Sequence, residues 1–390
     1  MLHCSNREPA QTFILLLSGL FIRLAVPHHC STQPDLVAQW RQTITLPNPI
    51  TVPLPLARAG CPQLAGPSRL KKPGARPKRI SLALQGGGAF GAFTWGVLDR
   101  LLEEGVSFDV VSGASAGAMN AALLASGLAQ GGAAEAQATL ERFWRKISEV
   151  GSQSRFFASN PILSRVTSQL SPYQFNPFDL SPLRDILTTE VDIEAVCQRA
   201  PVRLLLGATR VRDGALRLFR NKELTYDVVL ASACLPQLHQ AVLIDGEPHW
   251  DGGYAANPPL MPLVTATRAS DLMVVQIIPT NDADLPMTSG AINKRVNQIT
   301  FSNSLQRDLE ALSMMAQLCR EGDMQGSGLG RKLQRLKLHH LIAEDHVDGL
   351  SGLSFMNTDW GHLQHLRDQG QLAAEAWLSQ QSELSSQRMV

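Results

Sequence analysis

The chain has 390 residues, of which 44% are hydrophobic and 18% are charged, and its formal net charge is +1. This length and composition are typical of a globular protein with a sizeable core, and they leave room for one large α/β domain or two smaller ones. A nearly neutral chain with only 6% aromatic residues gives no reason to expect nucleic acid as a partner, because such partners need a basic surface or a base-stacking platform.

Six cysteines are spread along the chain without forming a Cys-x-x-Cys pair: Cys4, Cys30, Cys61, Cys197, Cys234 and Cys319. No zinc pattern can be built from this spacing. In a chain of this length, scattered cysteines favour free thiols in a reducing compartment. We therefore expect a cytoplasmic protein without a metal site.

Residues 1–77 differ in character from the rest of the chain. The apolar run 13–26 is followed by a proline-rich stretch, which disfavours regular helix. As a helix the run would span only about 21 Å, short of the roughly 30 Å hydrocarbon core of a membrane. It is also a poor secretory signal, since Glu8 accompanies Arg7 and Arg23 interrupts the run. Two interpretations stay open: a disordered extension with no role in the fold, or a weak export signal.

The folded part of the chain is expected to begin near Lys78 with two successive strand–helix units. Residues 80–85 and 108–112 are short apolar runs beside glycines, which predict buried strands. Residues 92–105 carry apolar side chains at helical spacing, and the small residues of 118–128 predict a second, buried helix. This order implies a parallel sheet with helical crossovers.

Strands and helices continue to alternate in the rest of the chain. Residues 202–211 and 215–219 predict a strand pair joined at Asp213-Gly214. Further elements are expected at 272–278 (strand), 289–320 (helix), 336–342 (strand) and 360–380 (helix).

The segment Gly113-Ala-Ser-Ala-Gly117 lies between the second strand and the helix that follows it. A G-x-S-x-G pentapeptide in that context predicts a nucleophile elbow, in which Ser115 occupies a sharp turn at the start of a helix. The helix N-terminus supplies amide donors and a partial positive charge where negative charge develops during a reaction. Without this context, the same residues would indicate only a structural turn.

A glycine-rich segment, Gly86-Gly-Gly-Ala-Phe-Gly91, directly follows the first strand. Contiguous glycines let backbone amides approach a ligand closely. The letters also fit the dinucleotide pattern G-x-G-x-x-G, but that site needs an acidic residue near the end of the second strand, and Asp109 lies at its start. We therefore favour an oxyanion hole formed by the amides of Gly87 and Gly88, with Gly86 as a further donor.

The third motif is His249-Trp-Asp-Gly-Gly253, and an aspartate followed by two glycines usually marks a plain turn. A serine nucleophile, however, needs a group that accepts its proton. Asp251 can do so directly if it is held dry and aimed at the hydroxyl. The alternative is a triad with a histidine base, for which the downstream candidates are His339, His340, His346, His362 and His365.

The three motifs, in this order, resemble the patatin-like phospholipase family, and the segments 231–236 and 250–258 are similar to its bacterial members. The resemblance implies a three-layer patatin-like α/β fold, with a mostly parallel central sheet flanked by helices. It also implies a Ser115–Asp251 dyad without histidine, and no metal or organic cofactor. The glycines that would support the motifs are Gly91, Gly113, Gly117, Gly252 and Gly253.

By this resemblance the chain is a serine acyl hydrolase that cleaves fatty-acyl esters of phospholipids, lysophospholipids or other lipids through an acyl-enzyme. The expected organisation is an N-terminal extension (1–77), a catalytic core (78–264) and a C-terminal α/β extension packed on that core (265–390). The expected partners are a lipid ester substrate and, transiently, a membrane or micelle surface, with the protein peripheral on the membrane.

One residue departs from the family's pattern, and one competing function remains. Phe90 stands where many bacterial relatives have a polar or basic residue, so an aromatic side chain is expected near the oxyanion hole. The competing function is a lipid-binding or regulatory module that has lost its activity. The intact serine, aspartate and glycine loop argue against it.

Overall fold

The computed structural model describes residues 14–17, 20–23, 79–158, 170–176, 179, 181–281, 285–321 and 328–387. The chain divides into two units, Met1–Pro55 and Leu56–Val390. In the first unit, β1 (Ile14–Leu17) and β2 (Leu20–Arg23) form an antiparallel pair. The other expectations for residues 1–77 lie outside the described residues.

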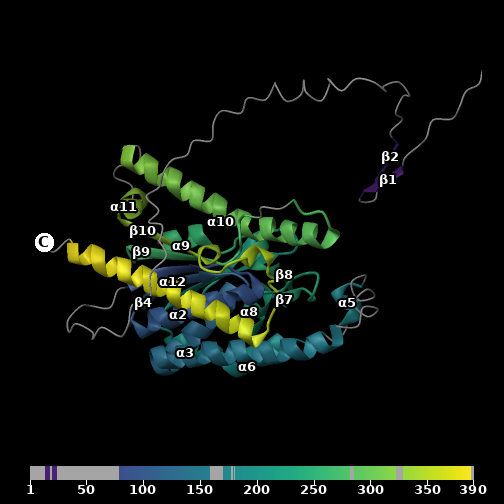
Figure 1. Cartoon of the computed structure of the whole chain (residues 1–390), viewed down its shortest axis with the longest axis horizontal. Helices are drawn as coiled ribbons and strands as arrows, with labels where there is room; N and C mark the ends of the chain where they lie inside the picture. Colours follow the sequence, from purple (N-terminus) through teal and green to yellow (C-terminus); the bar gives the residue numbers. More distant parts are fainter. Residues whose placement is uncertain are drawn as a thin grey trace, which may run out of the picture. The chain divides into compact units, whose positions relative to one another are not determined.

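Within the described residues, the second unit is built around an eight-stranded sheet with the strand order β10-β9-β3-β4-β5-β8-β7, and with β6 paired to β5 (Figure 1). The strands are β3 (Arg79–Leu84), β4 (Ser107–Gly113), β5 (Arg203–Arg210), β6 (Leu216–Phe219), β7 (Val242–Ile244), β8 (Glu247–Asp251), β9 (Asp271–Gln276) and β10 (Lys337–Ile342). The run from β10 to β5 is parallel, whereas β6, β7 and β8 pair antiparallel at one side. The mostly parallel sheet predicted from the sequence is confirmed.

Helices cover both faces of this sheet, which gives three layers (Figure 1). Helices α2, α3 and α12 lie on one face, and α9, α10 and α11 lie on the other. The helices are α2 (Gly91–Glu103), α3 (Ala116–Ala158), α5 (Pro172–Phe175), α6 (Pro182–Glu190), α7 (Ile193–Arg199), α8 (Tyr226–Ser232), α9 (Leu260–Ala266), α10 (Ser289–Glu321), α11 (Gly328–Arg335) and α12 (Trp360–Gln387). The predicted three-layer α/β fold is therefore confirmed.

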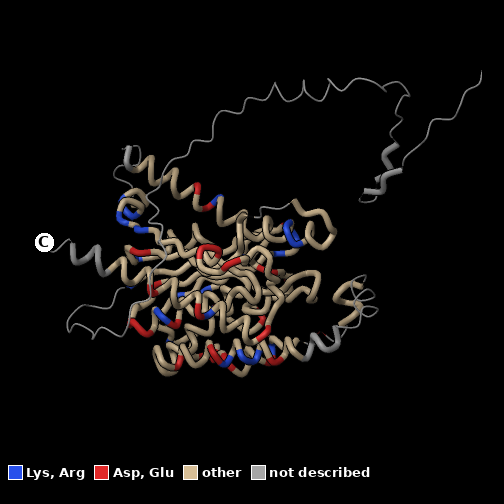
Figure 2. The backbone as a smooth tube through the Cα atoms, viewed as in Figure 1, with Lys and Arg blue, Asp and Glu red and all other residues tan. Residues whose placement is uncertain are grey.

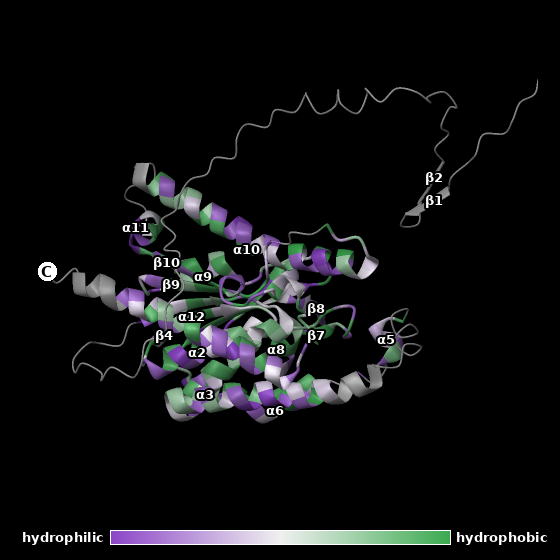
Figure 3. Ribbon diagram, viewed as in Figure 1, coloured by the Kyte–Doolittle hydropathy of each residue, from purple (hydrophilic) through white to green (hydrophobic). Residues whose placement is uncertain are grey.

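The central strands β3, β4, β5 and β9 are buried on both sides, and alternate side chains enter two separate cores. In β3, Leu82 and Leu84 join the cluster formed with α2, α3 and α12, whereas Ala83 joins the cluster formed with α9 and α10. This follows from the two-residue period of a strand. Because both faces are covered by helices, these central strands are near-continuous apolar runs, as the sequence indicated (Figure 3).

The sequence prediction missed the short helices α5 to α9 and α11, and it also differs from the observed structure in α3 and around β7 and β8. Helix α3 runs to Ala158, but its backbone leaves helical geometry at Gly131 and at Gly132, whose φ is +73°. The predicted helix 118–128 is therefore the first segment of α3. The short strands β7 and β8 were not predicted, because half-exposed side chains such as Leu243, 63% exposed, give them no clear apolar alternation.

Candidate active site

The three sequence motifs meet at one edge of the sheet. Strands β3 and β4 are parallel neighbours with Leu84 opposite Gly113, so the loops that follow them lie side by side. Strand β8 ends at Asp251, which lies opposite Ala208 of β5. Gly252 brings this end against the elbow, because a side-chain carbon added there would lie 3.2 Å from Cβ of Ala114.

The serine turn has the geometry of a nucleophile elbow. Ser115 is 8% exposed and adopts a φ of +54°, in the left-handed region that non-glycine residues rarely occupy. Its amide donates to the Ser232 carbonyl at 2.9 Å, which fixes the turn from the side of α8. A side chain at Gly113 would lie about 2.5 Å from the Gly117 backbone, and one at Gly117 would collide with the Leu84 carbonyl. Both glycines are thus required by close packing.

The glycine-rich loop is clamped onto this elbow by a buried amide side chain. Asn257, fully buried, accepts a hydrogen bond from the Gly86 amide at 2.7 Å and donates to the Gly86 carbonyl at 3.0 Å. It also donates to the Phe301 carbonyl of α10 at 2.9 Å. A side chain at Gly86 would lie 2.5 Å from Cβ of Ser115. Sequence reasoning missed Asn257, since an Asn-Pro after a glycine pair looks like ordinary turn chemistry.

Two amides of the loop remain available for a substrate. Within the described residues, no hydrogen bond engages the amides of Gly87 and Gly88, and both residues line the same cavity as Ser115. Gly88 has a φ of +56°, and a side chain there would collide with the Phe355 carbonyl. The Gly86 amide, by contrast, is engaged by Asn257. The fourth loop glycine, Gly91, packs against Ala116 and Trp144.

Asp251 is fully buried beside the serine. Its Oδ1 accepts a hydrogen bond from the Gly253 amide at 2.7 Å, and its backbone is held by Cys234 and Thr209. Its Oδ2 has no hydrogen-bond partner of ordinary geometry within the described residues. The Ser115 hydroxyl is nevertheless close enough to lower the pKa of the carboxyl. Such a pair is often misaligned without substrate and tightens when substrate binds.

Burial dominates the protonation of Asp251. Removal from water disfavours the charged form and raises the pKa from 3.8 to about 7, while the Gly253 amide and the Ser115 hydroxyl act in the opposite direction. A carboxyl with a pKa near neutrality can both accept and return a proton at neutral pH.

A cavity of about 630 Å³ opens beside the serine. This size lies within the usual range for pockets that bind small molecules. Its walls are largely apolar, and the aromatic side chain of Phe90, 4% exposed, is one of them. The lining residues from α10 are Asn293, Lys294, Val296, Asn297, Gln298 and Phe301. Lys294 is the only charged residue among the described residues that line the cavity.

The histidines of the triad alternative form their contacts elsewhere. His339 contacts the Asp271 carboxylate at 2.8 Å, and His340 contacts the Gln276 side chain at 2.9 Å. His249 contacts the Glu247 carbonyl at 2.8 Å and packs edge-on against Phe219. Among the described residues, no hydrogen bond joins a histidine to Ser115 or Asp251.

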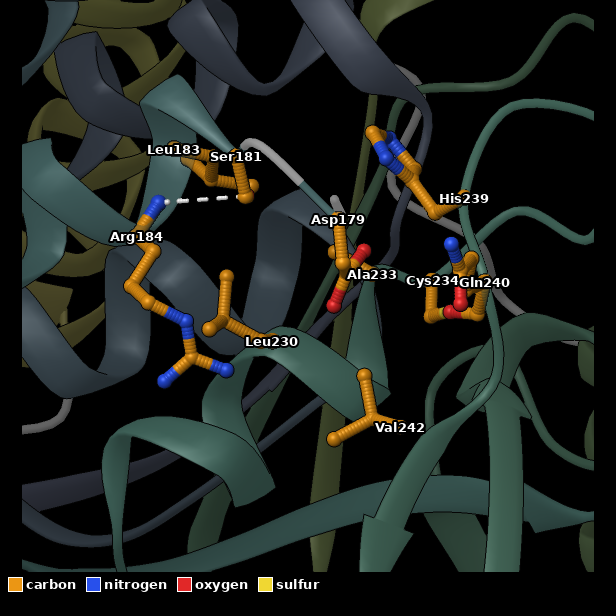
Figure 4. Close-up of a pocket in the computed structure, with 10 residues that line it drawn as sticks. All are labelled: Asp179, Ser181, Leu183, Arg184, Leu230, Ala233, Cys234, His239, Gln240 and Val242. Carbon is orange, nitrogen blue, oxygen red and sulfur yellow. Dashed lines mark hydrogen bonds between the residues drawn. The ribbon is translucent and has the colours of Figure 1, made fainter. Parts of the chain in front are cut away.

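A smaller cavity of about 30 Å³ holds a second group of reactive side-chain types, with Asp179, Cys234 and His239 in its wall (Figure 4). Burial raises the pKa of the Cys234 thiol to about 12, and the thiol donates to the Gln240 carbonyl at 3.0 Å. A thiol in that state is a poor nucleophile at neutral pH. The cavity is also too small for a lipid chain, so the larger one is the candidate site.

The dinucleotide alternative finds no support in the position of Asp109. This carboxylate is 2.9 Å from both Arg79 and Arg203, which begin β3 and β5. It therefore lies at the opposite edge of the sheet from the glycine loop and could not reach a ribose bound there. In the described part of the chain, no cluster of three potential ligands suits a metal ion. No helix among those residues is both long enough and apolar enough to cross a membrane.

Comparison with protein-family models finds one match. A family model described as patatin-like phospholipase matches residues 82–264. No curated protein matches the chain in a sequence search.

Solved structures give weaker likenesses. VipD from Legionella pneumophila is 17% identical with a TM-score of 0.40, over 78% of this chain and 67% of that one. The ExoU–SpcU complex of the Pseudomonas aeruginosa type III secretion system is 16% identical with a TM-score of 0.28, over 67% of this chain and 66% of that one. The chain thus spans about two thirds of the length of these relatives.

Proposed function

We propose that this chain is a lipid acyl hydrolase of the patatin-like phospholipase type, with Ser115 as its nucleophile and Asp251 as its base, and the family match over residues 82–264 supports this. The observation that carries the proposal is the meeting of three features at one cavity. These are the strained serine at its wall, the buried carboxyl beside that serine, and two unengaged loop amides.

The first half of the reaction forms an acyl-enzyme. As Ser115 Oγ bonds to the ester carbonyl carbon, its proton passes to the Asp251 carboxylate, and the carbonyl oxygen takes up the negative charge. When the carbon–oxygen ester bond breaks, Asp251 returns the proton to the departing alcohol. A base with a pKa near 7 suits both transfers, because at neutral pH both its proton-accepting and its proton-donating forms are well populated.

The glycine loop is proposed to stabilise the oxyanion. The amides of Gly87 and Gly88 are the donors, each worth roughly 3–4 kcal/mol in the transition state when well placed. Gly86 takes a different part from the one first expected, because its amide binds Asn257 and so anchors the loop. Asn257 is therefore proposed as a positioning residue.

Hydrolysis of the acyl-enzyme completes the cycle. Asp251 accepts a proton from water as the water oxygen attacks the acyl carbon. The bond between Ser115 and the acyl group then breaks, the serine recovers its proton, and the fatty acid leaves. Side chains of this chain supply every proton transfer in this scheme.

The substrate is proposed to be the fatty-acyl ester of a phospholipid, a lysophospholipid or another lipid. The cavity walls supply the apolar surface that an acyl chain needs, and Phe90 forms part of that surface. This gives the aromatic residue of the glycine loop a role in the binding of the chain.

Replacement of the nucleophile tests the proposal. Ser115→Ala should abolish hydrolysis of short-chain p-nitrophenyl esters while thermal melting shows a folded protein. Residual activity of more than a few per cent would exclude Ser115 as the nucleophile. A fully inactive parent protein would instead favour a lipid-binding module.

The division of the chain into an N-terminal extension (1–77), a catalytic core (78–264) and a C-terminal α/β extension (265–390) remains a proposal. It is supported by β9, which pairs with β3 of the core, and by α12, which packs in the same cluster as α2. Deletion of residues 1–75 should leave a soluble, active enzyme, and an insoluble or inactive product would contradict this division.

A further inference from the structure

Helix α10, which contributes to the wall of the larger cavity, exposes an apolar stripe. Ile292, Val296 and Ile299 recur at i, i+4 and i+7 and are 44%, 53% and 49% exposed. This spacing places them in one row along the helix. Further along the helix, Phe301 and Leu305 face the core, at 9% and 1% exposure. The core therefore does not use the stripe.

Other exposed apolar side chains lie in the cavity wall and directly before α10. Val296 lines the cavity, as do Leu238 and Met356, which are 38% and 53% exposed. Directly before α10, Leu285 and Met287 are 79% and 80% exposed. We call the following set the apolar rim: Leu238, Leu285, Met287, Ile292, Val296, Ile299 and Met356. Large exposed apolar side chains on a cavity-lining helix and beside it indicate an interaction surface.

The charge of this region has one sign. Residues 285–304 include Lys294 and Arg295 but no aspartate or glutamate (Figure 2). Lys294 lines the cavity and has no ion pair within the described part of the chain, whereas Arg295 donates to the Thr280 carbonyl at 3.0 Å. Apolar side chains with basic neighbours on a helix favour the interface of an anionic lipid layer.

The position of the rim selects a lipid surface over a protein as its occupant. Ser115 is only 8% exposed, so a substrate must reach it through the cavity, whose wall includes Leu238, Val296 and Met356 of the rim. A protein bound on the rim would block that entrance. A lipid layer on the rim would instead deliver an acyl ester to it.

We propose that the apolar rim docks on an anionic lipid surface, with the row Ile292, Val296 and Ile299 of α10 inserted among the lipids. This inference rests on the proposed function, because the surface supplies that reaction's substrate. The contact is a peripheral one, made by side chains that the fold leaves exposed.

The test measures cosedimentation of the full chain with vesicles of phosphatidylcholine mixed with phosphatidylglycerol. The rim variant is Ile292→Glu with Ile299→Glu, neither of which lines the cavity. The matched control is Met314→Glu with Leu318→Glu, on the same helix and 66% and 36% exposed in the parent. Both variants add two charges to exposed apolar positions four to seven residues apart.

The rim variant should bind vesicles at least tenfold more weakly, since burial of one isoleucine is typically worth about that factor or more in an equilibrium constant. Its hydrolysis of a soluble short-chain ester should match the parent, while its hydrolysis of vesicle lipid falls. The control should bind like the parent. If the rim variant has a lowered melting temperature, the single variants Ile292→Gln and Ile299→Gln should be used instead. They should show a smaller loss of vesicle binding.

Three results would overturn the inference: unchanged vesicle binding by the rim variants, an equal loss in the control, or a parent dimer that the rim variant dissociates. The last would assign the rim to a second copy of the chain. Ser115→Ala in the same assay separates docking from catalysis. Binding without ester hydrolysis by the parent would leave the docking intact and refute the proposed function.

Discussion

The ionised carboxylate of Asp251 should lower the free energy of unfolding at alkaline pH, and the variant Asp251→Asn should remove this destabilisation. The folded protein holds the carboxyl in a dry site, where burial raises its pKa from 3.8 to about 7. Asparagine keeps the shape of the side chain and can accept the Gly253 amide hydrogen bond, but it does not ionise. The variant should therefore lose activity while it gains stability at high pH.

The size of the gain follows from the pKa difference of about three. At 1.36 kcal/mol for each pKa unit, the ionised carboxyl costs the fold about 4 kcal/mol. Below about pH 3.8 the group is protonated in both the folded and the unfolded state, so the cost is absent. As the pH rises to about 7, the unfolded chain releases its proton while the folded protein keeps it, and stability falls. Above about pH 7 the loss is constant.

The assay is denaturant unfolding of parent and variant across this range. The free-energy difference should grow in favour of Asp251→Asn by roughly 2–3 kcal/mol between about pH 5 and pH 9. Asp213→Asn is the control, because Arg210 lowers the pKa of this exposed carboxyl to about 2. Asp213→Asn should therefore lower the stability of the folded protein above about pH 4, whereas Asp251→Asn should raise it. A difference between Asp251→Asn and the parent that stays constant with pH would refute the claim that Asp251 is a dry carboxyl of raised pKa.

Three further predictions concern the reaction. The acid limb of kcat/KM on a soluble ester should titrate with an apparent pKa near 7, set by Asp251, and a limb near 4 would contradict a buried base. Asn257→Ala should lower kcat by about a hundredfold with little change in KM, because it releases Gly86 and misplaces the loop amides. The control Ser304→Ala removes only a hydrogen bond to the Asn257 backbone and should keep most of kcat. An effect confined to KM would show that Asn257 does not position the loop. Single histidine-to-glutamine variants should keep activity within about tenfold of the parent at each of seven positions: His239, His249, His339, His340, His346, His362 and His365. A histidine variant that is folded but inactive, together with an active Asp251→Asn variant, would favour the triad.

The sequence revealed the parts of the site that depend on residues close together in the chain. The apolar runs of β3 and β4 and the glycines around Ser115 are local patterns, and parallel pairing of the two strands then brings their loops together. The pairing of Asp251 with the serine could be expected only from the family resemblance. The strain at Ser115 agrees with the elbow that its pentapeptide predicted.

The remaining parts depend on contacts that no local pattern encodes. Asn257 reaches Gly86 across 171 residues of chain, so neither residue's neighbours indicate the bond. The same contact explains why the Gly86 amide is engaged while those of Gly87 and Gly88 are not. Helix α10 was predicted from the sequence, but which face it buries depends on the packing of Phe301 and Leu305. The exposed row on α10 could therefore be identified only in the folded chain.

The central claim is that Ser115 is the nucleophile and Asp251 its base, and covalent labelling tests it most directly. A fluorophosphonate ester should modify the folded protein at one residue, which peptide mass spectrometry should identify as Ser115. Ser115→Ala should take up no label, and Asp251→Asn should be labelled at least about a hundredfold more slowly, because the two groups act as a unit. A label on any other residue, or equally fast labelling of Asp251→Asn, would contradict the account.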